Sequence, residues 1–163
     1  MAAPLAEPGQ RLLARIVDTL IVGVPVIVVV RALVSGHTVD VVAPPAVAGF
    51  MLLYESIQLA LWGRTLGKRL ARIEVVLAVP GERHHGGKGG ESAPLGFPRA
   101  VLRAAVYSLP IAVRPIPVLG LVAGIFWVAN AGLLYEGTRR QALHDRLAGT
   151  LVVNRELPDS SAP

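Results

Sequence analysis

Three long apolar runs constrain the fold of this 163-residue chain more than any other feature. They cover residues 16–34, 41–62 and 104–135. The first two approach the roughly 20 residues that a helix needs to cross a bilayer. Only 17% of the residues are charged, whereas soluble domains contain about a quarter. The sequence therefore predicts a membrane protein rather than a soluble domain.

The third run is too long for a single span. Its 32 residues would form a helix of about 48 Å at roughly 1.5 Å per residue, well beyond a hydrocarbon core of about 30 Å. Pro115 and Pro117 follow Arg114 within this run and favour a tight turn there. We therefore expect an all-α membrane protein whose four transmembrane helices cover residues 12–34, 41–62, 98–113 and 117–136.

The positions of the basic residues predict how the helices are oriented. With four spans, all lysines and arginines except Arg31 and Arg114 lie on one side of the membrane, which is 14 of the 16. The positive-inside rule places that side in the cytoplasm, with both termini, the loop 63–97 and the tail 137–163. The net charge of +5 thus belongs to membrane loops, and we expect no nucleic-acid partner.

The cytoplasmic segments predict a small cap with two short β-strands. Residues 72–79 and 150–154 are rich in β-branched side chains and could pair with each other. The glycine-rich stretch 81–97 is typical of a flexible linker, and Pro98 suits the first turn of the third helix.

The first apolar run begins with charged residues that a lipid-facing helix would not tolerate without partners. Arg11, Arg15 and Asp18 fall along one helical face. Asp18 would lie about 10 Å into the helix, and Glu55 would reach a similar depth from the same side. A cleavable signal peptide is a minor alternative for this run, which lacks a small-residue cleavage site.

These positions predict a buried polar layer in the inner half of the bundle, to which Arg103 and Tyr107 also belong. Intramembrane charges are candidates for function by default, so this layer is a candidate ion or proton site. Alternatively, Arg15 reaches the headgroups while Asp18 pairs with Arg15 or Arg103 and only locks the helices together. Both interpretations stay open. The candidate site consists of Asp18, Glu55, Arg15 and Asn130.

The segment "GRTLGKRL", which starts at Gly63, is not a phosphate-binding loop. It has three residues between its glycines instead of four, and no serine or threonine follows Lys68. We expect a juxtamembrane turn in which the glycines permit bending and Lys68, Arg69 and Arg72 meet anionic headgroups. The residues of this motif are Gly63, Thr65, Gly67 and Lys68.

The segment around His144 and Asp145 is not expected to bind a metal. The other histidines are His37, predicted on the opposite side, and His84 and His85 in the linker, so no ligand set forms. The chain contains no cysteine, and we expect no cofactor. We predict that Asp145 pairs with a basic residue such as Arg69 or Arg146 and that His144 hydrogen-bonds to backbone. The predicted cap residues are His144, Asp145, Gly149 and Thr150.

Three segments together resemble the RDD family of small multi-pass bacterial membrane proteins. They are "RLLARIVD" at 11–18, "GRTLGKRLARIEVV" at 63–76 and "RRQALHDRLAGTLVV" at 139–153. The arginine and two aspartates of the family name correspond to Arg11, Asp18 and Asp145. The resemblance implies one domain over residues 1–163 in a bacterial inner membrane. Some family members are associated with cation–proton antiport.

We therefore expect ion or small-solute transport, such as cation/proton exchange that uses Asp18 and Glu55. The alternative is a non-catalytic membrane scaffold or accessory subunit. No nucleophile, base and orienting group occur at recognisable spacing, so we do not expect an enzyme. The expected partners are anionic headgroups of the bilayer, a monovalent cation or proton, and further copies of the chain.

Overall fold

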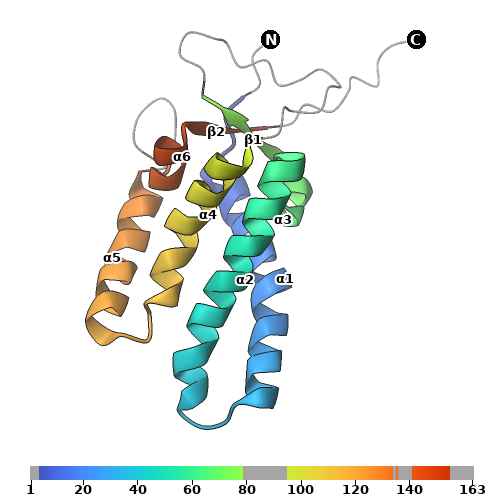
Figure 1. Cartoon of the computed structure of the whole chain (residues 1–163). Helices are drawn as coiled ribbons and strands as arrows, with labels where there is room; N and C mark the ends of the chain where they lie inside the picture. Colours follow the sequence, from blue (N-terminus) through green and yellow to red (C-terminus); the bar gives the residue numbers. More distant parts are fainter. Residues whose placement is uncertain (1–3, 79–94, 134, 136–140, 155–163) are drawn as a thin grey trace.

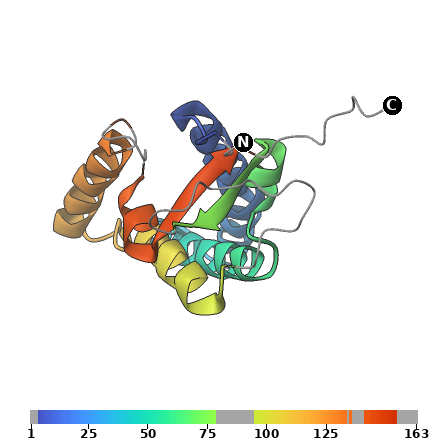
Figure 2. The same cartoon turned by 90° about the horizontal axis from the view of Figure 1, so that it is seen from above.

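A computed structural model describes residues 4–78, 95–133, 135 and 141–154. The protein is a bundle of helices with a small two-stranded sheet across one end (Figures 1 and 2). The elements are α1 (Pro8–Leu33), α2 (Thr38–Trp62), α3 (Leu66–Leu70), β1 (Ile73–Leu77), α4 (Phe97–Ala112), α5 (Pro117–Gly132), α6 (Leu143–Ala148) and β2 (Thr150–Asn154).

Helices α1 and α2 are the two candidate membrane spans. They form a helical hairpin and extend farther from the sheet than the other helices (Figure 1). Both are long and apolar enough to cross a bilayer. Their surfaces support this assignment, because α1 buries Asp18 while Val28 and Leu33 are exposed. Such an outward-facing apolar surface suits lipid rather than water.

Helices α4 and α5 form a second, shorter hairpin. Each has 16 residues, which corresponds to about 24 Å of helix. The chain turns between them at residues 113–116, where the sequence predicts the break. Helix α4 packs against α2, and α5 packs against α4. All four predicted segments are helical, but only α1 and α2 are long enough to be candidate spans, so the prediction of four transmembrane helices stays a prediction. Helix α5 ends at Gly132, whereas the prediction reaches residue 136, which lies outside the described residues.

The sheet and the two short helices form a cap at one end of the bundle. We use this name for α3, β1, α6 and β2. The predicted strand pairing is confirmed: β1 and β2 are antiparallel, and Val75 lies opposite Val152. The segment before α1 joins the sheet, since the amide of Ala6 donates a 3.0 Å hydrogen bond to the carbonyl of Val152.

The cap and the bundle share one apolar core, in which Leu59 of α2 meets the inner face of the sheet. The short helices α3 and α6 were not expected, because the sequence predicts only a turn and a cap segment there. Residues 79–94 lie outside the described residues, and they include most of the predicted glycine-rich linker 81–97. The tail after residue 154 lies outside them too.

Candidate functional site

Seven ionisable side chains gather where the helices meet the cap. The three carboxylates are almost completely buried, with at most 1% of each residue exposed. Burying charge is costly unless every group finds a partner, so these contacts dominate the local structure. We call this set the charged layer: Asp18, Glu55, Asp145, Arg11, Arg15, Lys68 and Arg103.

Asp18, on α1, accepts hydrogen bonds from three neutral donors. These are the hydroxyl of Tyr54 at 2.7 Å, the hydroxyl of Thr65 at 2.5 Å and the amide of Gly67 at 2.8 Å. The arrangement differs from the predicted pairing with Arg15 or Arg103. Sequence reasoning missed Tyr54, although a hydroxyl beside a charged residue in an apolar run was a usable signal.

The "GRTLGKRL" segment is shaped to receive Asp18. Gly63 ends α2 with a left-handed φ of 65°, and the Thr65 hydroxyl caps α3 by accepting the Lys68 amide at 3.3 Å. A Cβ on Gly67 would collide with the Ala14 carbonyl and lie 2.8 Å from the Asp18 carboxyl carbon. Gly67 therefore serves close helix approach rather than the predicted bending.

Glu55, on α2, neutralises two cations. Arg15 donates to its two oxygens at 2.8 and 3.3 Å, and the Lys68 ammonium donates at 3.1 Å. The structure thus brings Arg15 and Glu55 together, as the candidate site requires. Lys68 is only 5% exposed, so the predicted contact with headgroups is wrong. Burial lowers the pKa of Lys68, an effect that Glu55 opposes and Arg15 reinforces.

Arg15 also stacks on an aromatic cluster between the helices. Its guanidinium carbon lies 3.3 Å from the ring centroid of Tyr107 on α4. The Tyr107 ring in turn meets the ring of Trp127 on α5 edge to face, with centroids 4.1 Å apart. A cation over an aromatic face is stabilised by the ring quadrupole, so Arg15 is held by both Glu55 and Tyr107.

Asp145, on α6, holds two arginines from distant parts of the chain. Arg11 Nη1 lies 3.0 Å from its Oδ2, and Arg103 forms the second ion pair. These replace the predicted partners Arg69 and Arg146. Burial raises the pKa of Asp145, but Arg103, His144 and Arg11 together hold it below its usual value. Asp145 therefore ties α6 to α1 and α4 as an anion.

The remaining predicted residues surround Asp145. Burial lowers the pKa of His144 to about 3, so its imidazole is neutral at pH 7, and its Nε2 lies 3.5 Å from Asp145 rather than on backbone. Thr150 accepts from Arg103 at 2.6 Å, and Gly149 ends α6 with a φ of 63°. Asn130 accepts the Leu143 amide at 2.9 Å and joins α5 to α6, apart from Asp18 and Glu55.

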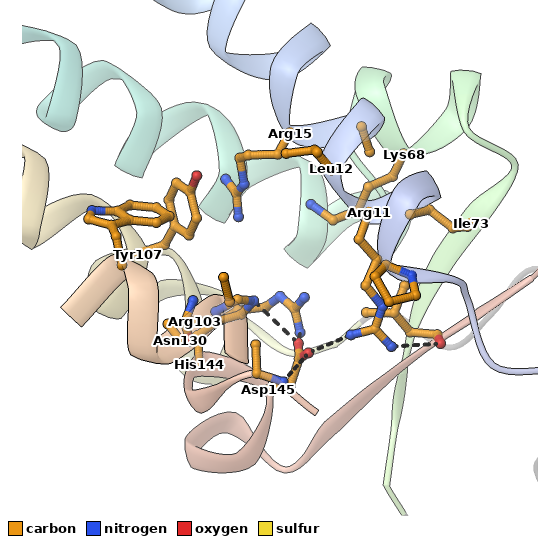
Figure 3. A pocket seen from close by; sticks show the side chains of 16 residues that line it. Arg11, Leu12, Arg15, Lys68, Ile73, Arg103, Tyr107, Asn130, His144 and Asp145 are labelled. Atoms are coloured by element: carbon orange, nitrogen blue, oxygen red, sulfur yellow. Dashed lines mark hydrogen bonds and ion pairs between the residues drawn. The ribbon is translucent and has the colours of Figure 1, made fainter. Parts of the chain in front are cut away.

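A cavity of about 180 Å³ opens beside the charged layer (Figure 3). Arg11 and Arg15 on α1, Lys68 on α3 and Arg103 on α4 all line it. Asp145 is the carboxylate among the lining residues. The candidate site is thus a network of ion pairs with a cavity on one side, and the charged residues that line this cavity are mainly cations.

Comparisons with known proteins identify the family. Neither the curated proteins nor the solved structures contain a match to the chain. The RDD family, in contrast, matches residues 5–149, which include Arg11, Asp18 and Asp145. This match covers most of the sequence and agrees with the resemblance of the three motifs. The chain therefore belongs to the RDD family, whose members are membrane-associated.

Proposed function

We propose that this protein exchanges a monovalent cation for a proton, with Asp18 as the cation ligand. The observation that carries the proposal is the difference between Asp18 and the other carboxylates of the charged layer. Glu55 and Asp145 each neutralise two cations, so discharging either would leave two buried positive charges unpaired. Asp18 accepts only neutral donors, and its charge is available to a ligand.

The surroundings of Asp18 offer oxygen ligands. The hydroxyls of Tyr54 and Thr65 point their protons at the carboxylate. The lone pairs of the two oxygens accept long hydrogen bonds of 3.3–3.4 Å, from the Leu66 amide and from the amide and ammonium of Lys68, which a cation would displace. If a Na⁺ or K⁺ ion met the carboxylate, both hydroxyls could rotate and turn those lone pairs to the ion. Oxygen ligands of this kind replace the hydration shell of monovalent cations in membrane proteins.

Lys68 is the proposed proton carrier. Its ammonium donates to Glu55 at 3.1 Å and to Thr65 at 3.4 Å. The Thr65 hydroxyl is thus a hydrogen-bond partner of both Lys68 and Asp18. Burial already lowers its pKa. A cation bound at Asp18 would repel the ammonium and promote release of one proton, which leaves a neutral amine and keeps the total charge constant.

The proposed topology has four spans, with both termini and the cap in the cytoplasm of a bacterial inner membrane. It rests on the two long apolar helices, the shorter apolar α5 and the distribution of lysines and arginines. Four helices are few for alternating access, so we propose that the transporter is a homo-oligomer.

Reconstituted protein tests this proposal. Proteoliposomes that contain a pH-sensitive dye would receive pulses of Na⁺, K⁺ or Li⁺. We expect proton movement with the wild type and none with Asp18→Asn. Lys68→Arg should also stop coupled proton movement, because a guanidinium keeps its proton. Asp40→Asn is the matched control, since Asp40 is an exposed aspartate on α2. Full flux from Asp18→Asn, or none from folded wild type with any of these cations, would refute the proposal.

A non-catalytic scaffold is the second candidate, and one observation favours it. The charged layer connects α1 to α2 through Arg15 and Glu55, and α1 to α6 through Arg11 and Asp145. Under this reading Asp18→Asn would lower the yield of folded protein, and the wild type would co-purify with a stable partner. Size-exclusion chromatography of Asp18→Asn separates the transporter from the scaffold. A variant that has lost only transport elutes as the wild type does, whereas a variant that has lost a structural contact aggregates or is recovered in lower yield.

A further inference from the structure

The cavity beside the charged layer has an excess of positive charge. Four cations line it, and they share two carboxylates, Glu55 and Asp145. His144 also lines it but is neutral at pH 7. Asp18 is the third carboxylate of the charged layer, so these four cations exceed the carboxylates by one positive charge, and an anion in the cavity would offset the cost of burying it.

A buried nitrogen atom on the cavity wall points to the same ligand. Arg103 is 2% exposed, and its Nε has no hydrogen-bond partner among the described residues. A guanidinium nitrogen can only donate. Buried polar atoms are nearly always satisfied, so an unmatched donor beside a cavity indicates a missing acceptor.

We propose that this cavity binds one phosphate group, held by Arg15, Lys68 and Arg103. The volume of about 180 Å³ is below the roughly 300–1,000 Å³ of drug-sized pockets and well above the space for one water. Several oxygens on one small anion match several donors, and guanidinium groups recognise phosphate in a forked geometry. The inference does not use Asp18, although Lys68 belongs both to this site and to the proposed cation/proton exchange.

The cavity is open toward the outside of the bundle. Leu12 of α1 and Ala131 of α5 line it, and both are exposed. Helix α5 packs on α4 and lies apart from α1 when the molecule is seen from the cap (Figure 2). The phosphate could therefore be a free anion or the headgroup of a lipid that enters between α1 and α5.

Trp127, which lines the cavity, can report binding. The chain has two tryptophans, so Trp62→Phe leaves Trp127 as the single tryptophan, which can be excited selectively over the tyrosines. Protein in phosphatidylcholine nanodiscs would be titrated with inorganic phosphate. A second series would replace part of the phosphatidylcholine with phosphatidic acid. We expect a saturable fluorescence change in at least one series. A saturable response in the phosphate series alone identifies a soluble anion as the ligand, and a response in the phosphatidic acid series alone identifies a lipid headgroup.

Charge changes at Leu12 separate binding from misfolding. Leu12→Glu places a carboxylate at the mouth of the cavity and should weaken binding by roughly tenfold or more, whereas Leu12→Lys should tighten it. A folding defect would weaken both. Leu13→Glu is the matched control, since Leu13 is exposed but does not line the cavity. An unsaturable signal in both series, or equal weakening by Leu12→Glu and Leu13→Glu, would overturn the proposal.

Discussion

Replacing Gly67 by alanine should destabilise the protein through a single added methyl group. That Cβ would overlap the carbonyl oxygen of Ala14 and stand 2.8 Å from the carboxyl carbon and Oδ1 of Asp18. Overpacking a tight interface costs about 1–3 kcal/mol. Pushing Asp18 away from the Gly67 amide would also weaken a charge-assisted hydrogen bond of 2.8 Å, which contributes about 1.5–3 kcal/mol.

The helical preference of alanine offsets part of this loss. Alanine is favoured over glycine by about 1 kcal/mol in a helix interior, which leaves a net loss of about 1.5–5 kcal/mol for Gly67→Ala. Gly49→Ala is the matched control, because Gly49 lies in α2 and a Cβ there meets nothing within 4 Å. The control should gain about 0.5–1 kcal/mol.

Unfolding by sodium dodecyl sulfate in mixed micelles, followed by circular dichroism, measures both free energies. The two variants should move in opposite directions from the wild type. If Gly67→Ala proved as stable as Gly49→Ala, the close contact between α1 and α3 would not govern this position, and the assignment of Asp18 to the amide of Gly67 would fail.

Three further predictions address the cap and the topology. Burial lowers the pKa of His144 to about 3, whereas an unfolded histidine titrates near pH 6.5, so between these values the unfolded state binds one more proton. The free energy of unfolding should therefore fall as the pH is lowered from 6.5 to 3. It should fall less steeply in His144→Gln than in the control His37→Gln. Asp145→Asn should cost about 3–5 kcal/mol because it leaves two buried arginines without their anion, and adding Arg11→Gln should recover part of the loss in the same unfolding assay. The chain has no cysteine, so a single introduced thiol can report the topology. Ser35→Cys in the turn between α1 and α2 should react with an impermeant maleimide from outside the cell, whereas Leu70→Cys on α3 should react only after permeabilisation. The reverse pattern would invert the proposed orientation.

The long elements of this fold could be predicted because each has a strong local signal. Apolar length identifies α1 and α2, the prolines near residue 115 divide α4 from α5, and β-branched residues mark β1 and β2. The helices α3 and α6 have 5 and 6 residues, too few for a periodic pattern to emerge. Contacts made by the rest of the protein stabilise them, and a local signal does not report such contacts.

Three charged members of the site were predictable, but Tyr54 and the pairing of the charges were not. Charges inside apolar runs stand out, so Asp18, Glu55 and Arg15 are found by inspection. Partners depend on where separate helices come to lie, and Asp145 therefore meets Arg11 and Arg103 rather than its neighbour Arg146. The role of Gly67 was misjudged for the same reason, because the atoms that exclude its Cβ come from α1.

The ion pair between Arg11 and Asp145 also imposes an order on biosynthesis. The two residues are separated by 134 positions, so at roughly 5–20 residues per second Asp145 is made about 7–27 s after Arg11. As a membrane span, α1 would therefore insert before the partner of Arg11 has been synthesised. A chain truncated before α6 would keep Arg11 and Arg103 without their carboxylate, a defect that membrane quality-control proteases could recognise. The docking of α6 thus completes the charge pairing of a helix that was synthesised much earlier.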